Sequence, residues 1–279
     1  MKLVFRTWNL NFWRDRYIGK PKSNIDMYNW LETGKNIITK EWIKFNEPEM
    51  IRFWLLQESS IEMYDELIYS PDYSNMVRYY ELHKAKQSGR IDQPWGLIIE
   101  SMQNKSRLYD VKKNPKGLYC VKTELENGIT LVIINVHTQI YTGHEKNYSV
   151  EYYKTLKNEI IPSIENILKK ERNNLIILGG DFNMNRNYID YDGVEKYNGQ
   201  ILFDKIEKEL KLIDCTRGTD FYDMSTMIDP LNTDKEIKND YFFINEEYYK
   251  YLNKEEVIID RYDDEYYTDH FFVEISINL

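Results

Sequence analysis

The strongest constraint on the fold comes from short apolar runs, most of which are followed at once by a polar side chain. Leu131–Val136 and Leu175–Leu178 consist almost entirely of Leu, Ile and Val, which is typical of strands buried on both faces of a sheet. Runs of this length are far too short to cross a bilayer, so no stable membrane association is expected. Because helical patterns separate the runs, the chain is expected to adopt an α/β fold with mixed sheets.

The same pattern predicts the individual elements. Strands are predicted over Lys2–Trp8, Ile51–Leu56, Trp95–Ile99, Gly117–Leu125, Ile129–Val136, Leu175–Leu178, Tyr241–Ile244, Glu256–Ile259 and Phe271–Ile277. Helices are predicted over Ile25–Phe45, Ser149–Lys170 and Ile201–Leu212. No repeat, low-complexity tract or flexible linker interrupts the chain, so a single domain over residues 1–279 is expected.

Composition narrows the class of protein. A formal net charge of −9 argues against nonspecific coating of nucleic acid, although it leaves room for a local basic groove. Cys120 and Cys215 are the only cysteines and lie in apolar surroundings, which favours two reduced, buried thiols over a disulfide. The N-terminal residues show no apolar core of signal-peptide length, so a cytoplasmic protein is expected, and a monomer is assumed.

Carboxylate, carboxamide and imidazole side chains mark the ends of most central strands. These residues are Asn9, Glu58, His137, Asp181, Asn183, Asp240, Asp269 and His270. Burying so many polar groups is costly unless they share a site. Carboxylates are suitable ligands for a hard divalent cation, and imidazoles can donate to phosphoryl oxygens or exchange protons. The set favours phosphoester hydrolysis, in which Gly179 and Gly180 are expected to let the backbone approach a bound phosphate.

At this point the residues resemble the endonuclease/exonuclease/phosphatase superfamily, whose fold deoxyribonuclease I, exonuclease III, neutral sphingomyelinases and inositol polyphosphate 5-phosphatases share. The matching strings are Thr7-Trp8-Asn9, Leu56-Gln57-Glu58, Asn135-Val136-His137-Thr138, Gly180-Asp181-Phe182-Asn183, Asp240-Tyr241-Phe242-Phe243 and Thr268-Asp269-His270. They occur in the family's order and span residues 7–270. The resemblance implies a four-layered α/β sandwich, with two mixed β-sheets packed face to face and helices outside.

The resemblance also implies a bound cation, Mg²⁺ or Mn²⁺. Glu58 matches the family's metal-binding glutamate, Asn9 the asparagine that helps to position the metal, and Asp269 an aspartate near it.

Catalytic roles are implied for five further matches. Asp181 would orient or deprotonate the attacking water, and Asn183 would lie beside the phosphate and bind substrate. Asp240 would orient His270, which would contact a phosphoryl oxygen. His137 matches a histidine of the deoxyribonuclease I-like, sphingomyelinase and 5-phosphatase branches, which abasic-site endonucleases generally lack there.

Three features depart from the family's pattern or leave a choice open. Residues 17–47 are expected to form an added helical segment near the site. Thr268 stands where serine is usual, which keeps the hydroxyl. The acidic partner of His137 is left open between Glu81 and Glu100.

The substrate is less constrained than the chemistry. Lys112 and Lys113 lie in a locally basic stretch, Lys105–Lys122, which is either a groove that follows a nucleic-acid backbone or a solvated face. A nuclease acting on DNA or RNA is the first hypothesis. The alternative is a phosphatase or phosphodiesterase acting on a small or lipid-linked phosphoester, although the spacing of Arg186 from Asn183 departs from the 5-phosphatases. A catalytically silent binding module is the third reading.

Overall fold

The computed structural model describes residues 1–10, 36, 50–58, 77–83, 93–100, 107–108, 117–138, 148–191, 193–228, 236–260, 268 and 270–279. For residues 77–83, 93–100, 107–108 and 148 it describes the backbone alone. The predicted helix over Ile25–Phe45 and the added segment 17–47 lie outside these residues, except for Asn36.

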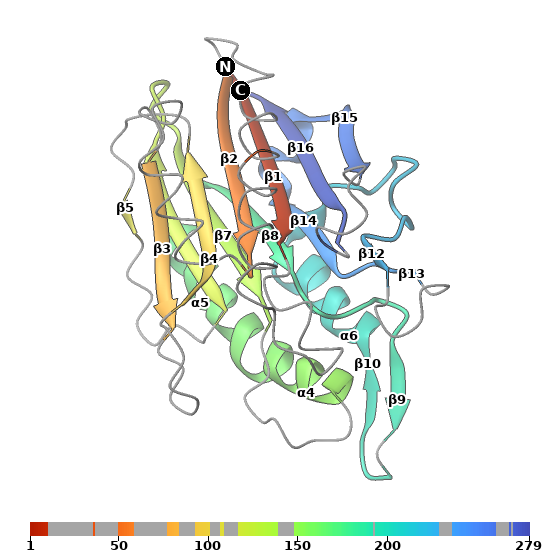
Figure 1. Cartoon of the computed structure of the whole chain (residues 1–279). Helices are drawn as coiled ribbons and strands as arrows, with labels where there is room; N and C mark the ends of the chain where they lie inside the picture. The colour runs from red at the N-terminus through yellow and green to blue at the C-terminus, as the bar shows by residue number, and fades with distance from the viewer. Residues whose placement is uncertain are drawn as a thin grey trace.

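Two mixed sheets form the centre of the molecule (Figure 1). The strands of the first sheet, in order, are β15 (Leu252–Asp260), β16 (Phe272–Asn278), β1 (Lys2–Asn9), β2 (Met50–Gln57), β4 (Gln93–Glu100) and β3 (Val77–His83). The strands of the second sheet are β11 (Leu212–Asp214), β14 (Asp240–Asn245), β8 (Leu175–Asp181), β7 (Thr130–His137), β6 (Leu118–Glu124) and β5 (Arg107–Leu108). All nine predicted strands are therefore confirmed, with ends that move by a few residues.

The sheets pack face to face through an apolar layer. Phe5, Phe53 and Leu55 from the first sheet and Ile133 and Ile177 from the second belong to this layer, and none of these side chains is exposed to solvent. Burial is continuous along β1 and β2 beyond their first residues, so both faces of the first sheet are covered there, although Arg6 and Arg52 interrupt the apolar sequence. The packing confirms the expected sandwich of two mixed sheets.

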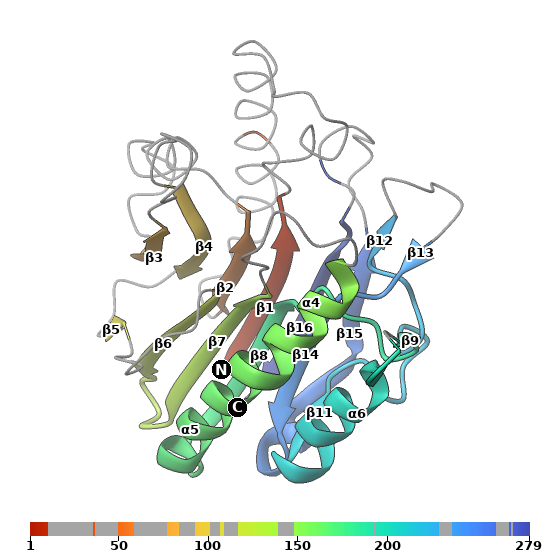
Figure 2. The same ribbon diagram turned by 90° about the horizontal axis from the view of Figure 1, so that it is seen from below.

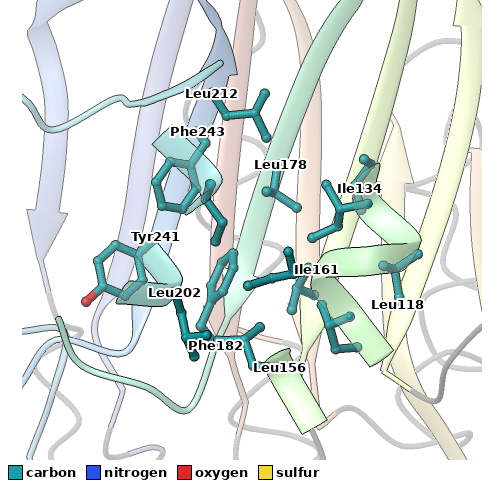
Figure 3. Close-up of a cluster of buried hydrophobic side chains, with 14 of the residues drawn as sticks. Leu118, Ile134, Leu156, Ile161, Leu178, Phe182, Leu202, Leu212, Tyr241 and Phe243 are labelled. Carbon is teal, nitrogen blue, oxygen red and sulfur yellow. The ribbon is translucent and has the colours of Figure 1, made fainter. Parts of the chain in front are cut away.

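Helices cover the outer face of the second sheet (Figure 2). One continuous helical stretch consists of α4 (Tyr148–Thr155), η2 (Leu156–Ile160) and α5 (Ile161–Glu171), and a second consists of α6 (Gly199–Asp204) and η3 (Lys205–Glu209). Figure 3 shows the core beneath them, in which Leu156, Ile161 and Leu202 from the helices meet Ile134 and Leu178 from the strands. This is the outer helical layer that was expected on this side of the sandwich.

Short elements complete the described fold. They are the hairpin of β9 (Ile189–Tyr191) and β10 (Lys196–Asn198), the hairpin of β12 (Met227–Ile228) and β13 (Glu236–Ile237), and the 3-10 helix η4 (Glu246–Tyr251). The second helix ends earlier than predicted, because Lys211 takes a positive φ of 59° and the chain then joins the second sheet as β11.

One parallel pair of strands in each sheet points its carboxyl end to the same end of the sandwich (Figure 1). In the first sheet β1 and β2 run in register, with Asn9 beside Gln57. In the second sheet β7 and β8 do the same, with His137 beside Asp181. Polar residues at the carboxyl ends of these four strands are thereby brought together.

Candidate active site

Asn9 joins the two halves of the site. It is the last residue of β1, and its Nδ2 donates a 2.9 Å hydrogen bond to Oδ2 of Asp181 at the end of β8 in the other sheet. The same Nδ2 lies 3.4 Å from Oε1 of Glu58, which directly follows β2. One buried amide thus holds two carboxylates from different sheets close together.

Glu58 presents its carboxylate from a strained backbone position. Its φ is 47°, in the left-handed region that residues other than glycine rarely adopt. Burial raises the pKa of this carboxyl, but the hydrogen bond and the charge of His137 outweigh burial and hold the pKa below its ordinary value. Oε2 of Glu58 is buried and has no hydrogen-bond partner among the described residues.

His137 is paired with Glu58. Nε2 of the imidazole lies 3.1 Å from Oε1 of the carboxylate. Burial lowers the pKa of His137, yet the hydrogen bond and charge of Glu58 raise it above its ordinary value. Glu81 and Glu100 were the two predicted acidic partners of His137, and the backbone register places them differently. Glu81 pairs with Gly96, which pairs with Gln57, so Glu81 lies at the same level of the sheet as the site.

Glu100 does not belong to that level. It pairs with Phe53, four residues before Gln57 on β2, and its backbone therefore lies on the order of 13 Å further along the strand. The side chains of Glu81 and Glu100 lie outside what the structure describes.

Asp181 and Asn183 form a tight turn at the end of β8. The backbone N–H of Asn183 donates to Oδ1 of Asp181 at 2.7 Å, and its Nδ2 donates to Oδ2 of Asp181 and to the carbonyl of Thr138, both at 3.1 Å. Asn183 also has a positive φ, 48°. Burial raises the pKa of Asp181 to about 6; the charge of Asp240 adds to the rise and that of His270 opposes it.

Asp240 and His270 form the other side of the site. Nδ1 of His270 lies 2.9 Å from Oδ2 of Asp240, and Nε2 of His270 lies 3.9 Å from Oδ2 of Asp181. With Nδ1 donating to Asp240, Nε2 is the ring nitrogen that faces Asp181. Among the described residues, Asp181, Asp240 and His270 are a group whose ligand-type atoms lie within 4.8 Å of one another.

Thr268 anchors the histidine to the first sheet. Its Oγ1 donates to the carbonyl of Asn9 at 2.8 Å and accepts from the N–H of His270 at 3.1 Å. Nε1 of Trp8 donates to the carbonyl of His270 at 3.3 Å. The hydroxyl that threonine shares with the family's usual serine is therefore used here.

A buried polar bridge joins the sheets directly beneath the site. Nε2 of Gln57 donates to Oδ1 of Asn135 at 2.6 Å and to Oγ1 of Thr7 at 2.9 Å, and all three side chains are fully buried. Gln57 precedes Glu58, and Thr7 and Asn135 each lie two residues before a site residue. These three residues lie within the matching strings but were not predicted as site residues. A Gln, a Thr and an Asn inside buried strands are the sequence signal that such residues share hydrogen bonds.

The structure therefore brings together seven of the predicted site residues. They are Asn9, Glu58, His137, Asp181, Asn183, Asp240 and His270. Three others, Asp269, Lys112 and Lys113, lie outside the described residues.

The two glycines before Asp181 have a different function from the one expected. A Cβ on Gly179 would lie 2.2 Å from the ring of Phe242, and a Cβ on Gly180 would lie 1.9 Å from the carbonyl oxygen of Val136. The space at both positions is filled by the protein's own strands and leaves no room there for a phosphate. Both glycines belong to β8 and allow its close packing.

Arg186 is engaged away from the site. Its guanidinium forms 2.8 Å ion pairs with Glu207 and Asp214 and lies 4.7 Å from the ring centroid of Phe203. It links the second helical stretch to β11, which is a structural role.

No helix in the described part of the chain is long and apolar enough to cross a membrane. Comparison with known sequences gives no match: no family model and no curated protein matches the chain.

Solved structures match over the whole chain. The AP endonuclease LMAP from Leishmania major is 11% identical, with a TM-score of 0.65, over 100% of this chain and 88% of that one. A variant of the 3′ phosphatase NExo from Neisseria, bound to product DNA hairpin, is 14% identical, with a TM-score of 0.61, over 99% of both chains.

A third match carries the family name suggested by the motifs. An endonuclease/exonuclease/phosphatase family protein from Leptotrichia buccalis is 14% identical, with a TM-score of 0.58, over 99% of this chain and 100% of that one. Together with the two mixed sheets and the order of the strands, these likenesses show that the chain has the endonuclease/exonuclease/phosphatase fold, the fold of deoxyribonuclease I.

Proposed function

We propose that the chain is a divalent-metal-dependent phosphoesterase that hydrolyses phosphodiester bonds of nucleic acid. One observation carries the proposal: carboxylates, amides and imidazoles from both sheets converge at one end of the sandwich, in contact with one another and buried. Such a concentration of buried polar groups destabilises a fold unless the groups serve a common site.

The residues present fit a hard cation. An ionised carboxylate oxygen that is buried without a hydrogen-bond partner is unfavourable, and Oε2 of Glu58 is in that position among the described residues. Mg²⁺ and Mn²⁺ prefer oxygen ligands of this type. Glu58, with Asn9 beside it, would hold the cation, which when bound supplies a Lewis acid that offsets charge on a phosphoryl oxygen.

The group of Asp181, Asp240 and His270 is a less suitable place for the cation. Nδ1 of His270 is already hydrogen-bonded to Asp240, and Nε2 is the nitrogen left to face a substrate. We therefore assign this group to proton transfer and charge stabilisation.

Each of the remaining residues has a part in the proposed reaction. Asp181, whose pKa of about 6 places it near neutrality, accepts a proton from the attacking water at a carboxylate oxygen. Asn183, fixed by Asp181 and Thr138, binds a phosphate oxygen. His270, oriented by Asp240, donates from Nε2 to a phosphoryl oxygen, and His137 stabilises charge on the other side of the phosphate.

Nucleic acid is the proposed substrate because two of the structural neighbours act on DNA or are bound to it. One is a 3′ phosphatase bound to product DNA hairpin and another is an AP endonuclease. At 11% and 14% identity these neighbours establish only the fold, so DNA or RNA as the substrate is our proposal.

A panel of substrates tests the function. The protein is incubated with Mg²⁺ or Mn²⁺ and single-stranded DNA, duplex DNA, RNA, inositol phosphates or sphingomyelin, and the wild type is compared with Glu58→Gln. Metal-dependent cleavage of a nucleic acid that is lost in Glu58→Gln supports the proposal. Turnover of an inositol phosphate or sphingomyelin alone would favour the small-phosphoester alternative, and full activity in excess EDTA would contradict metal dependence.

A further inference from the structure

The Asp240–His270 pair is built from two segments that are distant along the chain. Asp240 is the first residue of β14 in the second sheet, whereas His270 lies two residues before β16 in the first. Their hydrogen bond of 2.9 Å therefore depends on how the start of one strand is placed against the approach to another. A third segment, at Thr226, is hydrogen-bonded to the backbone beside both residues.

Thr226 fixes the side that carries Asp240. Its Oγ1 accepts hydrogen bonds from the backbone N–H groups of Asn239 and Asp240, each at 2.9 Å. Thr226 is completely buried, so water cannot replace this acceptor without rearrangement. Both lone pairs of the hydroxyl are thereby used on Asp240, the first residue of β14, and on Asn239, the residue before it.

The backbone of Thr226 fixes the side that carries His270. Its carbonyl accepts a 2.6 Å hydrogen bond from the N–H of Phe271, the residue directly after His270. The next residue, Met227, forms an isolated antiparallel bridge with His270 itself. The N–H of Thr226 donates to the carbonyl of Ile237 at 2.9 Å, which ties the residue to β13.

We propose that Thr226 is the positioning residue of the Asp240–His270 pair, an inference that rests on the proposed function. Its side chain holds the backbone of Asp240 and its main chain holds the backbone beside His270, so one residue sets the separation of the two. Thr226 touches neither the reacting atoms nor the carboxylate of Asp240, and it acts through backbone placement alone.

The test compares three substitutions. Thr226→Val keeps the shape and removes the acceptor, and Thr226→Ser keeps the acceptor. Thr216→Val is the matched control: Thr216 is also buried, and its hydroxyl donates to Asp214 and accepts from Lys238, neither of which is a residue of the site. For each variant kcat and KM are measured on the substrate identified by the panel, and the free energy of unfolding is measured with denaturant.

Thr226→Val is expected to lower kcat by about 10- to 100-fold with little change in KM, as loss of outer supporting contacts does at other sites. Thr226→Ser should restore kcat to within about threefold, and Thr216→Val should lose stability with kcat unchanged. In a His270→Ala background Thr226→Val should cause no further loss, because the pair on which it acts is gone. Equal losses of kcat in Thr226→Val and Thr216→Val, or an undiminished loss in the His270→Ala background, would overturn the inference.

A second measurement separates this inference from the proposed function. In the resting, ¹⁵N-labelled protein the His270 Nδ1–H resonance reports the hydrogen bond to Asp240 and needs no substrate. It should shift in Thr226→Val and stay in place in Thr226→Ser and Thr216→Val. If no substrate is turned over, the proposed function is wrong, but the resonance still tests the role of Thr226. A resonance that is unchanged in Thr226→Val contradicts the inference.

Should Thr226→Val not fold, Thr226→Ala replaces it, compared with Thr216→Ala. The smaller side chain leaves space for a water molecule, which can accept from both N–H groups but does not fix their position. Thr226→Ala must still shift the His270 resonance more than Thr216→Ala does.

Discussion

Nε2 of His137 lies 3.1 Å from Oε1 of Glu58, so a histidine at the end of a strand in one sheet is paired with the proposed metal ligand that follows a strand of the other. Burial opposes ionisation of both groups, yet each moves the pKa of the other toward the charged form. A change to either residue therefore alters the charge of its partner.

Glu58→Gln is expected to weaken cation binding and turnover together. Glutamine preserves the size of the side chain but removes the charge that attracts the cation and that pairs with His137. We expect the Mn²⁺ affinity, measured by calorimetry without substrate, to fall by at least about 10-fold. Asn187→Ala, at an exposed turn beyond Asn183, serves as the control. Unchanged Mn²⁺ affinity in Glu58→Gln would place the cation elsewhere.

His137→Ala and His270→Ala should each reduce kcat by at least about 100-fold, because positioned donors at a phosphoryl group contribute roughly that much or more. Single-turnover kinetics at saturating substrate measure the chemical step directly. Circular dichroism should show an unchanged fold in both variants. A loss of less than about tenfold in either one would remove that histidine from the mechanism.

Asp240→Asn and His270→Ala should behave as one unit. Asn lacks the negative charge that favours a protonated imidazole, so Asp240→Asn alone should lose nearly as much as His270→Ala. Because the second substitution then has little left to remove, the double variant should be about as slow as the worse single variant. Barrier increases that simply add in the double-mutant cycle would show that the two side chains act independently.

The rate should depend on pH through Asp181. Burial raises the pKa of this carboxyl to about 6, so below this value it holds a proton and cannot accept one from water. The logarithm of kcat/KM should rise with pH and become level above about 6; a bound cation can shift this limb only to lower pH, because positive charge favours the ionised carboxylate. Residual activity of Asp181→Asn that still shows the same limb would assign it to another group.

Gly180→Ala is expected to destabilise the fold by more than about 2 kcal/mol. The added Cβ would lie 1.9 Å from the carbonyl oxygen of Val136, and the φ of 135° is unfavourable for alanine. Denaturant unfolding measures the loss. Gly193→Ala has open space around its Cβ, although its φ is also positive, and thus isolates the steric part of the effect. Equal losses in the two variants would mean that the contact with β7 carries no cost.

The central strands could be predicted because complete burial requires apolar residues, and these strands consist almost entirely of them. β7 and β8 are buried along their length, and a continuous apolar run is what such strands require. β3 was not predicted, since Tyr79-Tyr80-Glu81 breaks the alternation expected of a strand. The two-residue strands β12 and β13 carry no local signal at all and form because neighbouring segments supply their partners.

The site was predictable as a set of residues but not as a set of contacts. The order of the polar strings predicted Asn9, Glu58 and the others as a group from the chain alone, and the structure brings seven of them together. The pairing of His137 with Glu58 was missed because it joins two sheets, and the separation of the two residues along the chain does not indicate such a contact. Thr226 was missed for another reason: its hydroxyl binds backbone N–H groups, which every sequence provides.

The pairing of β1 with β16 has a consequence for how the candidate site forms during folding. The two strands pair Lys2 with Asn278, so this part of the first sheet cannot form until the two ends of the chain have been brought together. Contacts between residues so far apart carry a large loop-closure entropy and form slowly. Because His270 reaches Asp240 only when β16 is docked, the candidate site should be the last part of the molecule to form, well after hydrophobic collapse.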